Sequence, residues 1–418
     1  MAFIIRDVRV FDGEKVLEDG RVYVQDGIIR EVGPDVDVSG VAVISMPGHT
    51  LLPGLIDSHC HPYRQSNLPE QAFRFGITTI MDMHNLHDNA VIQKQWARER
   101  SDYPDVKSCH FAATINDGWP AWVEKKLNNN EHSTYDDWPN VSREEDADSF
   151  IERSLNDGAD YIKLMHEGGR ALGIGSGSGL VQTRQSVQAA VVKSAHNKGF
   201  KVVAHALSLK DTIEVLEAGV DGLAHTFFDE PISQECIDLY VSTGAWLNPT
   251  LVAAGTLTCE SKSISEEFSR DPRVSSRVGA DDLERMHQCL HMKSTGAKWE
   301  YAIDSVRQLR AAGVDIVCGS DAAAGAPGLV FGANLHLEMK LLTSKAGMST
   351  IEVLKGVTSL VADKFGFPDR GRLAPGLKAD LLLVEGNPIV EIGDLLNIRG
   401  IWRDGVKFKG HPGFAQVY

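Results

Sequence analysis

Paired cysteines are missing from this sequence. Six cysteines are scattered through its 418 residues, without a CxxC pair or the regular spacing of a disulfide framework. Such spacing marks small disulfide-stabilised domains and many structural zinc sites, so the sequence argues against both classes. We therefore predict reduced thiols at Cys60, Cys109, Cys236, Cys259, Cys289 and Cys318.

Long hydrophobic runs are missing as well. The N-terminus reaches its first charged residue at Arg6, which leaves no room for the apolar stretch of a secretory signal. No run approaches the roughly 20 apolar residues that a membrane-spanning helix needs. From these two absences we expect a cytoplasmic protein without a membrane partner.

An excess of positive charge is the third absence. The formal net charge is -15, whereas proteins that bind nucleic acids gather Lys and Arg on one face. We therefore expect a small-molecule partner and no nucleic acid. With 43% hydrophobic residues the chain can bury a large core, and its length fits one large domain with a smaller companion. A homo-oligomer stays open.

The two ends of the chain have the pattern of β-structure. Residues 1–53 alternate apolar and polar positions in short runs that are separated by turn signals. Residues 365–418 contain two similar runs, ADLLLVEG and IRGIWRDGVKFKG. We expect these two segments to pair into one small β-sandwich domain.

Residues 54–364 alternate short apolar runs with helical stretches, which is the pattern of βα units around a parallel sheet. Helices are expected over Val181–Gly199 and Leu209–Gly219. Eight strands with intervening helices predict an α/β fold, the (β/α)8 or TIM barrel, whose active site lies at the C-terminal ends of the strands. The expected strands lie in LLPGLIDSH, ITTIMDM, KSCHFAATI, DYIKLM, KVVAHA, GLAHT, AWLNPT and DIVCGSD.

Four of these strands end in histidine or aspartate. His59 and His61 follow the first strand, and His205, His225 and Asp321 follow the fifth, sixth and eighth. Imidazole nitrogens and carboxylate oxygens suit zinc and similar divalent ions. Because side chains alternate along a strand, the two imidazoles of HCH point the same way and the intervening cysteine points elsewhere. The set predicts a metal site in which that cysteine only packs.

Lys163 lies in the segment DYIKLM, where apolar neighbours imply a buried strand. A buried ammonium is costly unless it is paired or neutralised. A structural salt bridge meets this requirement, and so does carbamylation by carbon dioxide, which turns the amine into a carboxylate able to bridge two ions. The residues alone leave both alternatives open.

The segments PGLIDSHCH, YIKLM, VVAHA, GLAHT and GSDAA, in this order, resemble the amidohydrolase superfamily, and the resemblance covers nearly the whole chain. The tail GRLAPGLKADLLLVEGNPI is similar to the family's C-terminal signature. A lysine on the fourth strand resembles the binuclear-metal branch of Xaa-Pro dipeptidases and imidazolonepropionase-like hydrolases. This resemblance implies a metal-dependent hydrolase in which carbamylated Lys163 bridges two divalent ions, expected to be Zn²⁺.

The resemblance also implies how the ligands divide. His59, His61 and Asp321 would hold one ion, and His205 and His225 the other. Two ions roughly 3.5 to 4 Å apart would share a hydroxide that attacks a carbonyl carbon. Asp321 is the implied catalytic residue, because its carboxylate can accept the proton and pass it to the leaving nitrogen.

Substrate contacts are expected in the loops that follow the strands. Arg64 suits a substrate carboxylate, because a guanidinium matches a carboxylate bidentately. The segment INDGWPAWVEKK departs from the Gly-Gly-His element that those dipeptidases often carry, so their specificity does not transfer. Its two tryptophans, together with Trp138, either line an apolar pocket or cover a helix. The candidate substrate-binding residues are Tyr63, Arg64, Trp119, Trp122 and His166.

Several functions stay open at this point. The leading hypothesis is hydrolysis of a linear amide, either an N-acyl amino acid or a dipeptide. A cyclic amide or lactone, as in hydantoinase-like enzymes, is the alternative, because the same metal centre serves both. A mononuclear deaminase typically uses one ion and no bridging lysine. A barrel that binds a molecule without catalysis would lack one of the metal-binding residues, and none of them is missing from this sequence.

Overall fold

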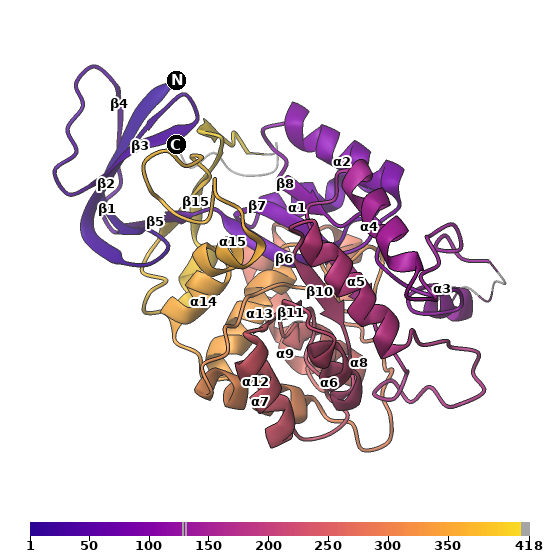
Figure 1. The fold of residues 1–418 in the computed structure, drawn as a ribbon. Coiled ribbons are helices and arrows are strands. Elements are labelled where there is room, and N and C mark those ends of the chain that lie inside the picture. The colour runs from indigo at the N-terminus through magenta and orange to yellow at the C-terminus, as the bar shows by residue number, and fades with distance from the viewer. Residues whose placement is uncertain (128, 130–131, 411–418) are drawn as a thin grey trace.

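Strands from both ends of the chain form one sheet in the computed structural model, which describes residues 1–127, 129 and 132–410. The predicted pairing of the two ends is confirmed, since β5 lies antiparallel to β14 in the order β16-β15-β14-β5-β1-β2-β3, with β4 beside β1 (Figure 1). The sandwich description and the boundaries after residues 53 and 364 stay predictions, and residues 411–418 lie outside the described residues. The strands are β1 (Ala2–Phe11), β2 (Val16–Gln25), β3 (Ile28–Gly33), β4 (Ala42–Ser45), β5 (His49–Pro53), β14 (Leu381–Glu385), β15 (Ile398–Arg403) and β16 (Val406–Lys407).

The middle of the chain contains two sheets of parallel strands. One has the order β13-β6-β7-β8 and the other the order β12-β11-β10-β9. All residues of β6, β9 and β10 are buried, as expected for parallel strands that are covered on both faces. These strands are β6 (Leu55–His61), β7 (Ile77–Asp82), β8 (Asp105–Ser108), β9 (Ile162–Met165), β10 (Val202–His205), β11 (Gly222–Leu223), β12 (Trp246–Leu247) and β13 (Ala322–Ala323).

Isolated bridges lie beside both outer strands of the second sheet. Ala113 bridges to Leu164 of β9, and Leu247 of β12 bridges to Ile316. Two expected strands are shorter than predicted: the third stops at Ser108, and the eighth is reduced to the bridge of Ile316 ahead of β13. A left-handed backbone angle at His110 (φ 56°), two positions beyond β8, accounts for the end of the third strand, because such a residue interrupts a ladder.

Helices surround the parallel strands (Figure 1). The expected helix after β9 begins at Gln185, four residues later than predicted. The expected helix after β10 begins at Leu209, as predicted, and the Ser208 hydroxyl caps it by accepting a hydrogen bond from the Asp211 amide. The helices are α1 (Asn67–Phe73), α2 (His87–Glu99), α3 (Ala121–Leu127), α4 (Asp146–Asp157), α5 (Gln185–Asn197), α6 (Leu209–Glu217), α7 (Gln234–Thr243), α8 (Leu251–Thr258), α9 (Lys262–Ser269), α10 (Pro272–Ser275), α11 (Ala280–Arg285), α12 (Trp299–Ala311), α13 (Ala333–Ser344), α14 (Thr350–Gly356), α15 (Ser359–Phe365) and the 3-10 helix η1 (Ile392–Leu396).

One disulfide corrects the prediction that all cysteines are reduced. Cys259 at the end of α8 is bonded to Cys289, 30 positions further along the chain, with their Cα atoms 5.4 Å apart. The segment after α11 returns to α8, where the Met292 amide donates to the Leu257 carbonyl at 2.8 Å. The spacing of the cysteines in the sequence does not reveal that these two segments lie together. The remaining four cysteines are free and buried.

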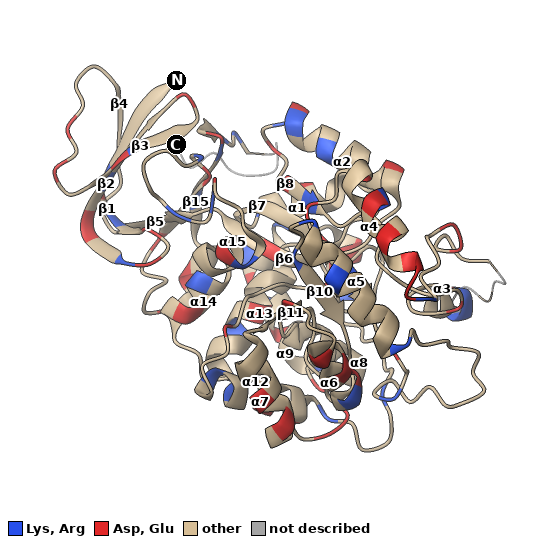
Figure 2. Ribbon diagram, in the orientation of Figure 1, with Lys and Arg blue, Asp and Glu red and all other residues tan. Residues whose placement is uncertain are grey.

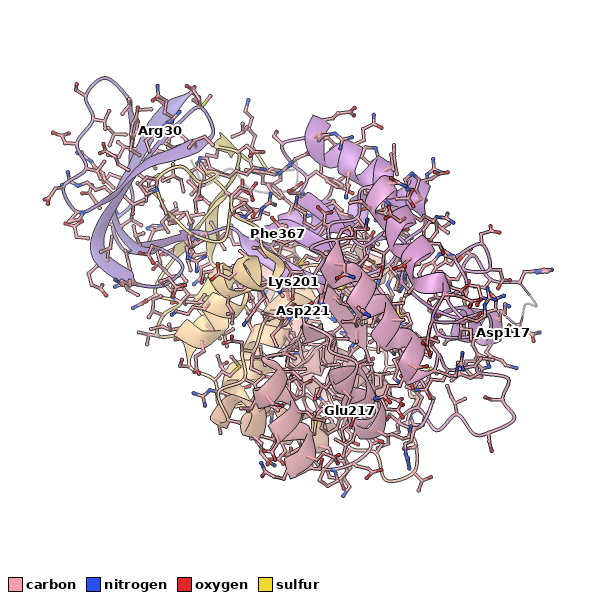
Figure 3. The ribbon with its side chains drawn as sticks, viewed as in Figure 1. Arg30, Asp117, Lys201, Glu217, Asp221 and Phe367 are labelled. Carbon is pink, nitrogen blue, oxygen red and sulfur yellow. A yellow bond between two sulfur atoms is a disulfide. The ribbon has the colours of Figure 1, made fainter. Side chains whose placement is uncertain are left out.

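Charged residues cover the outside of the molecule. Figure 2 shows acidic and basic residues interspersed on the helices, with acidic ones on α4, α6 and α7. Lys201 and Asp221 lie close together in Figure 3, and their Nζ and Oδ1 atoms are 2.8 Å apart. Since Lys201 directly precedes β10 and Asp221 directly precedes β11, this ion pair joins the N-terminal ends of the two strands. Across residues 1–127 and 132–410, no helix is long and apolar enough to cross a membrane.

Candidate metal centre

Three side chains from two neighbouring segments meet at one point. The Nε2 atoms of His59 and His61, at the end of β6, lie 3.1 Å apart and point the same way, as expected. Asp321 Oδ1 is 3.2 Å from His59 Nε2 and 3.1 Å from His61 Nε2. The Cys60 thiol donates instead to the Met81 carbonyl, 3.5 Å away, which is a packing role. Nitrogen and oxygen atoms gathered in this way suit a divalent ion.

Two further imidazoles continue this cluster. The ring centroid of His225 lies 4.7 Å from those of His59 and His205. Ligand atoms of His59, His225 and Asp321 all lie within 4.8 Å of one another. Lys163 of β9 is paired with Val203 of β10, two positions before His205. The structure therefore gathers the predicted ligands at the C-terminal ends of β6, β10 and β11, with Lys163 on the adjacent β9.

Burial determines the charges in this cluster. Burial first, and then the charge of Lys163, lower the pKa of His59 and His61 well below the usual value, so both imidazoles are neutral. Burial also lowers the pKa of Lys163 and raises that of Asp321, and each of these two groups opposes the shift of the other. Within the described part of the chain, Lys163 Nζ has no hydrogen-bond partner. Neutral imidazoles and an unpartnered buried amine fit a metal centre, whose ligands must be deprotonated.

In three of the imidazoles, one ring nitrogen forms a hydrogen bond to a residue outside the cluster. An N–H group that donates to a fixed partner leaves the electron pair of the other nitrogen free, which is how proteins orient histidine ligands. The cluster therefore has the outer contacts expected around a metal ion. They are His59 Nδ1 to the Ala224 carbonyl at 3.0 Å, His225 Nδ1 to the Thr250 hydroxyl at 2.8 Å, and His205 Nε2 to Glu167 Oε2 at 3.0 Å.

The backbone places Asp321 beside the histidines. Asp321 has a left-handed φ of 53°, a conformation that costs free energy in a residue other than glycine. Its amide donates to the His59 carbonyl at 2.8 Å. The preceding Ser320 donates its hydroxyl to Asp57 Oδ2 at 2.6 Å, and burial raises the pKa of Asp57 to about 6. Asp57 was not singled out from the sequence, although it stands two positions before His59 on the same strand.

A family comparison agrees with this geometry. A profile described as the amidohydrolase family matches residues 50–408. The chain belongs to this family. The expectation that it is an enzyme of the amidohydrolase superfamily is therefore confirmed.

Stretches of this amidohydrolase are similar to curated proteins. A dihydroorotase of Acetivibrio thermocellus is 48% identical over 40 residues, which are 10% of this chain and 9% of that relative. An imidazolonepropionase of a Geobacillus species is 34% identical over 79 residues, 17% of this chain and 19% of that relative. The chain thus matches only a small part of the length of each relative.

Solved structures share the amidohydrolase fold over the whole chain. The crystal structure of a Xaa-Pro dipeptidase with bound methionine in the active site has a TM-score of 0.75 and covers 98% of this chain and 100% of its own. Its sequence is 21% identical, so this likeness shows the fold alone.

The tryptophans of the long loop between β8 and α4 have different surroundings. Trp119 stacks on His205, with ring centroids 5.5 Å apart and an interplanar angle of 20°. Trp122 has a different partner, because its indole N–H donates to the Ser178 carbonyl at 3.1 Å. Trp138 is only 4% exposed and packs in the core. Of the two alternatives for this loop, Trp119 fits a site wall and Trp138 fits a cover.

His84 is a neighbour of the cluster that the sequence reading missed. Its ring stacks on His61 with 4.0 Å between centroids and 29° between planes, and its Nδ1 has no partner among the described residues. The ring centroids of Tyr63 and His84 are 6.0 Å apart, and the Tyr63 hydroxyl is 2.9 Å from that of Tyr135. The sequence contains a clue to His84, because this residue directly follows the expected strand ITTIMDM. The predicted metal ligands follow their strands in the same way.

The side chains of two predicted substrate residues, Arg64 and His166, make no hydrogen bond to the cluster ligands within the described residues, although the His166 amide donates to the His205 carbonyl at 3.1 Å. Arg64 is exposed. His166 is buried and turned toward α6, where its Nε2 lies 2.8 Å from Glu214 Oε2. His166, Asp211 and Glu214 form a second group of possible ligands. In that group, however, Asp211 already accepts from the Gly168 amide at 3.1 Å.

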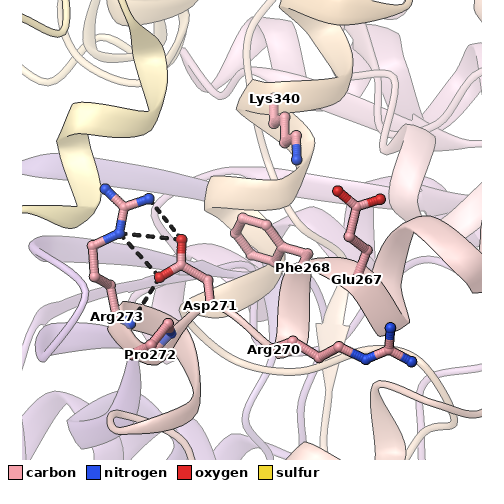
Figure 4. A pocket seen from close by; sticks show the side chains of 7 residues that line it. All are labelled: Glu267, Phe268, Arg270, Asp271, Pro272, Arg273 and Lys340. Atoms are coloured by element: carbon pink, nitrogen blue, oxygen red, sulfur yellow. Dashed lines mark hydrogen bonds and ion pairs between the residues drawn. The ribbon is translucent and has the colours of Figure 1, made fainter.

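A surface hollow on α9, α10 and α13 is shown in Figure 4. Arg273 folds back on Asp271, and its Nη2 donates to Oδ2 at 2.6 Å. Because these charges satisfy each other, the histidine cluster stays the candidate site. The lining residues, none of them a predicted site residue, are Glu267, Phe268, Arg270, Asp271, Pro272, Arg273 and Lys340.

Proposed function

We propose that this amidohydrolase hydrolyses the carbon–nitrogen bond of an amide at its carbonyl carbon, with two divalent metal ions. The observation that carries the proposal is the meeting of His59, His61 and Asp321 within 3.2 Å. The outer hydrogen bonds of the neighbouring imidazoles support it, because they leave ring nitrogens free for ions.

The proposal includes a closed (β/α)8 barrel. The bridges from Ala113 to Leu164 and from Leu247 to Ile316 support it, because Ala113 follows β8 and Ile316 precedes β13, so both outer strands of the second sheet pair with segments next to the first. In such a barrel the ligand-bearing strand ends all belong to the face on which active sites are built.

Two groups of residues would hold the ions. His59, His61 and Asp321 would bind the first, and His205 and His225 the second. Their imidazole and carboxylate donors suit Zn²⁺. When bound, such ions acidify a water molecule and polarise a carbonyl group.

Lys163 would join the two groups as a carbamate. Its amine adds to carbon dioxide with loss of one proton, which forms an N–C bond and leaves a carboxylate. This step needs the neutral amine, and burial favours that form by lowering the pKa of Lys163. A structural salt bridge has less support, because no acceptor contacts Nζ among the described residues.

Asp321 would move the proton. Its carboxylate, held beside His59 and His61, accepts a proton during attack and returns it to the leaving nitrogen, which is otherwise a poor leaving group. Burial raises the pKa of Asp321, which favours proton uptake. Asp321 is therefore the proposed catalytic residue.

The substrate would be an N-acyl amino acid or a dipeptide with an apolar or aromatic portion. Trp119 and Tyr63 support this, because each is partly exposed and lies next to the cluster, on the His205 side and on the His61 side respectively. Aromatic faces add stabilisation of about 0.5–1.5 kcal/mol when they stack on an aromatic partner.

A cyclic amide is the second candidate. The local sequence matches to dihydroorotases favour it. A deaminase acting through one ion has less support, because the chain provides donors for two ions and a lysine between them.

Metal analysis followed by a substrate panel tests the proposal. We expect two ions per chain, and turnover of an N-acyl amino acid, a dipeptide or a cyclic amide that stops when the ions are chelated. One ion per chain, with ammonia released from an amino-substituted heterocycle, would establish the deaminase instead. Fully metal-loaded protein that cleaves no amide in the panel would contradict the proposal.

A further inference from the structure

Glu167 contacts the cluster from outside. It stands two positions beyond β9, is 2% exposed, and accepts a hydrogen bond from His205 Nε2 at its Oε2 atom, 3.0 Å away. Its other carboxylate oxygen, Oε1, accepts from the Gly169 amide at 2.7 Å. Both acceptor atoms of this buried carboxylate are therefore occupied by N–H donors.

His205 has few other restraints. One ring face lies against Trp119, and the ring edge meets His225 at 82° with 4.7 Å between centroids. Within the described part of the chain, Glu167 makes the one hydrogen bond to this imidazole. Stacking fixes the plane of the ring, but only the hydrogen bond decides which nitrogen carries the proton.

We infer that Glu167 is a positioning residue that keeps the proton of His205 on Nε2 and thereby secures the second of the two ions. With Nε2–H donating to Glu167, the electron pair of Nδ1 is free to bind. This inference rests on the proposed two-ion function. It assigns a role to a carboxylate that binds neither ion.

The neighbouring acids do not share this role. Asp211 accepts from the Gly168 amide and from Gln182 Nε2, at 3.1 and 2.8 Å. Glu214 pairs with His166 at 2.8 Å. Glu214 therefore offers a matched control, since it is a glutamate bonded to a nearby histidine whose ring makes no hydrogen bond to the cluster ligands among the described residues.

Two substitutions separate chemistry from size. Glu167→Gln keeps the volume but has one acceptor oxygen, so its amino group must face either Gly169 N–H or His205. Facing His205, it favours the form with the proton on Nδ1, which cannot bind an ion. Glu167→Asp is one methylene shorter but keeps two acceptor oxygens. If Glu167 only fills space, Glu167→Gln should weaken binding of the second ion less than Glu167→Asp does. If Glu167 positions His205, Glu167→Asp should weaken it less.

The test measures Zn²⁺ per chain after dialysis, Zn²⁺ affinity by competition with a chelator, and the melting temperature of the metal-free proteins. We expect two ions in the unaltered enzyme and in Glu214→Gln. In Glu167→Gln we expect one tightly held ion and a second bound about 10–100-fold more weakly, with Glu167→Asp between them. Melting temperatures of the metal-free proteins should stay close, which separates metal loss from unfolding.

Two results would overturn the inference. One is a Glu167→Gln variant that keeps both ions with unchanged affinity, and the other is a Glu167→Asp variant that loses the second ion more completely than Glu167→Gln does. Substitution with Co²⁺ gives an independent signature, because loss of the second site halves the visible absorption per chain. If the unaltered enzyme itself held fewer than two ions, the proposed function would fail, and this inference with it.

Discussion

Asp57 holds Ser320 with both of its carboxylate oxygens. The Ser320 amide donates to Oδ1 at 2.9 Å and the Ser320 hydroxyl donates to Oδ2 at 2.6 Å. This pair ties β6 to the residue before Asp321, which itself has a left-handed backbone. The position of the proposed catalytic carboxylate thus depends on a residue that is not among the proposed metal ligands.

We predict that Asp57→Asn loosens Asp321. An asparagine replaces the acceptor Oδ2 with an amino group, so the Ser320 hydroxyl loses its 2.6 Å bond and must donate instead to the His59 carbonyl, 3.3 Å away, at a cost of about 0.5–1.5 kcal/mol. The free energy of unfolding should fall by that amount, measured by denaturant titration of the metal-free protein. Turnover should fall as well, whereas unchanged turnover with full stability would show that Asp321 needs no such support.

Lys163→Ala should lose the second ion. The substitution removes the proposed bridge between the two groups of ligands, so elemental analysis should find about one ion per chain and little activity. Short carboxylic acids should restore part of the activity, because they supply a bridging carboxylate. Two retained ions with intact activity would exclude the carbamate.

Asp321→Asn should reduce turnover by about 10²–10⁴-fold, the range that general acid–base help supplies. Substrate binding should change less, so kcat falls more than KM rises. Steady-state kinetics on variant protein with confirmed metal content measures both constants. A turnover number equal to that of the unaltered enzyme would remove the proton-transfer role.

The sequence predicted best what a local pattern determines. The strand β6 and the residues His59 and His61 follow from a short apolar stretch ahead of an HxH pair, because burial and alternation act within a few residues. The pairing of the chain ends also followed from local patterns. The family resemblance then ordered the ligands, including Lys163.

Partners distant in the chain were not predictable in this way. Asp57 and Ser320, or His205 and Glu167, meet only because the strands have a particular register, which a local pattern does not encode. The unexpected Cys259–Cys289 disulfide also joins distant segments, because the chain after α11 returns to the end of α8. Trp119 and Trp122 lie in the same loop and were both predicted to contact substrate, but their indoles have different neighbours, His205 and Ser178 respectively.

Asp82 should make stability depend on pH. Burial raises its pKa to about 8, against hydrogen bonds from Asn85 and Ser108 that lower it. Between its unfolded pKa of about 4 and about pH 8, the folded state holds a proton that the unfolded state has lost, so stability falls as the pH rises. Asp82→Asn cannot ionise, so its free energy of unfolding should fall less over this range.

Denaturant titrations of the two metal-free proteins at several pH values check this prediction. Other buried acids contribute equally to both proteins, so the difference between the two curves isolates Asp82. The curves should lie closest at low pH and separate as the pH rises, with the variant becoming relatively more stable. Parallel curves would show that Asp82 has an ordinary pKa in the folded protein.

Trp119 should determine the preference for aromatic substrates. Its ring stacks on His205, whereas the Trp122 indole N–H donates to the Ser178 carbonyl. Trp119→Ala should therefore lower kcat/KM for an aromatic N-acyl amino acid about tenfold, since losing an aromatic contact of about 1.4 kcal/mol has that effect, and leave small polar dipeptides nearly unchanged. Trp119→Phe should recover much of the loss, and Trp122→Ala is the matched control with little effect on either substrate. Equal losses for aromatic and small substrates would mean that Trp119 only supports His205, and a larger loss in Trp122→Ala would place the substrate on the other side of the loop.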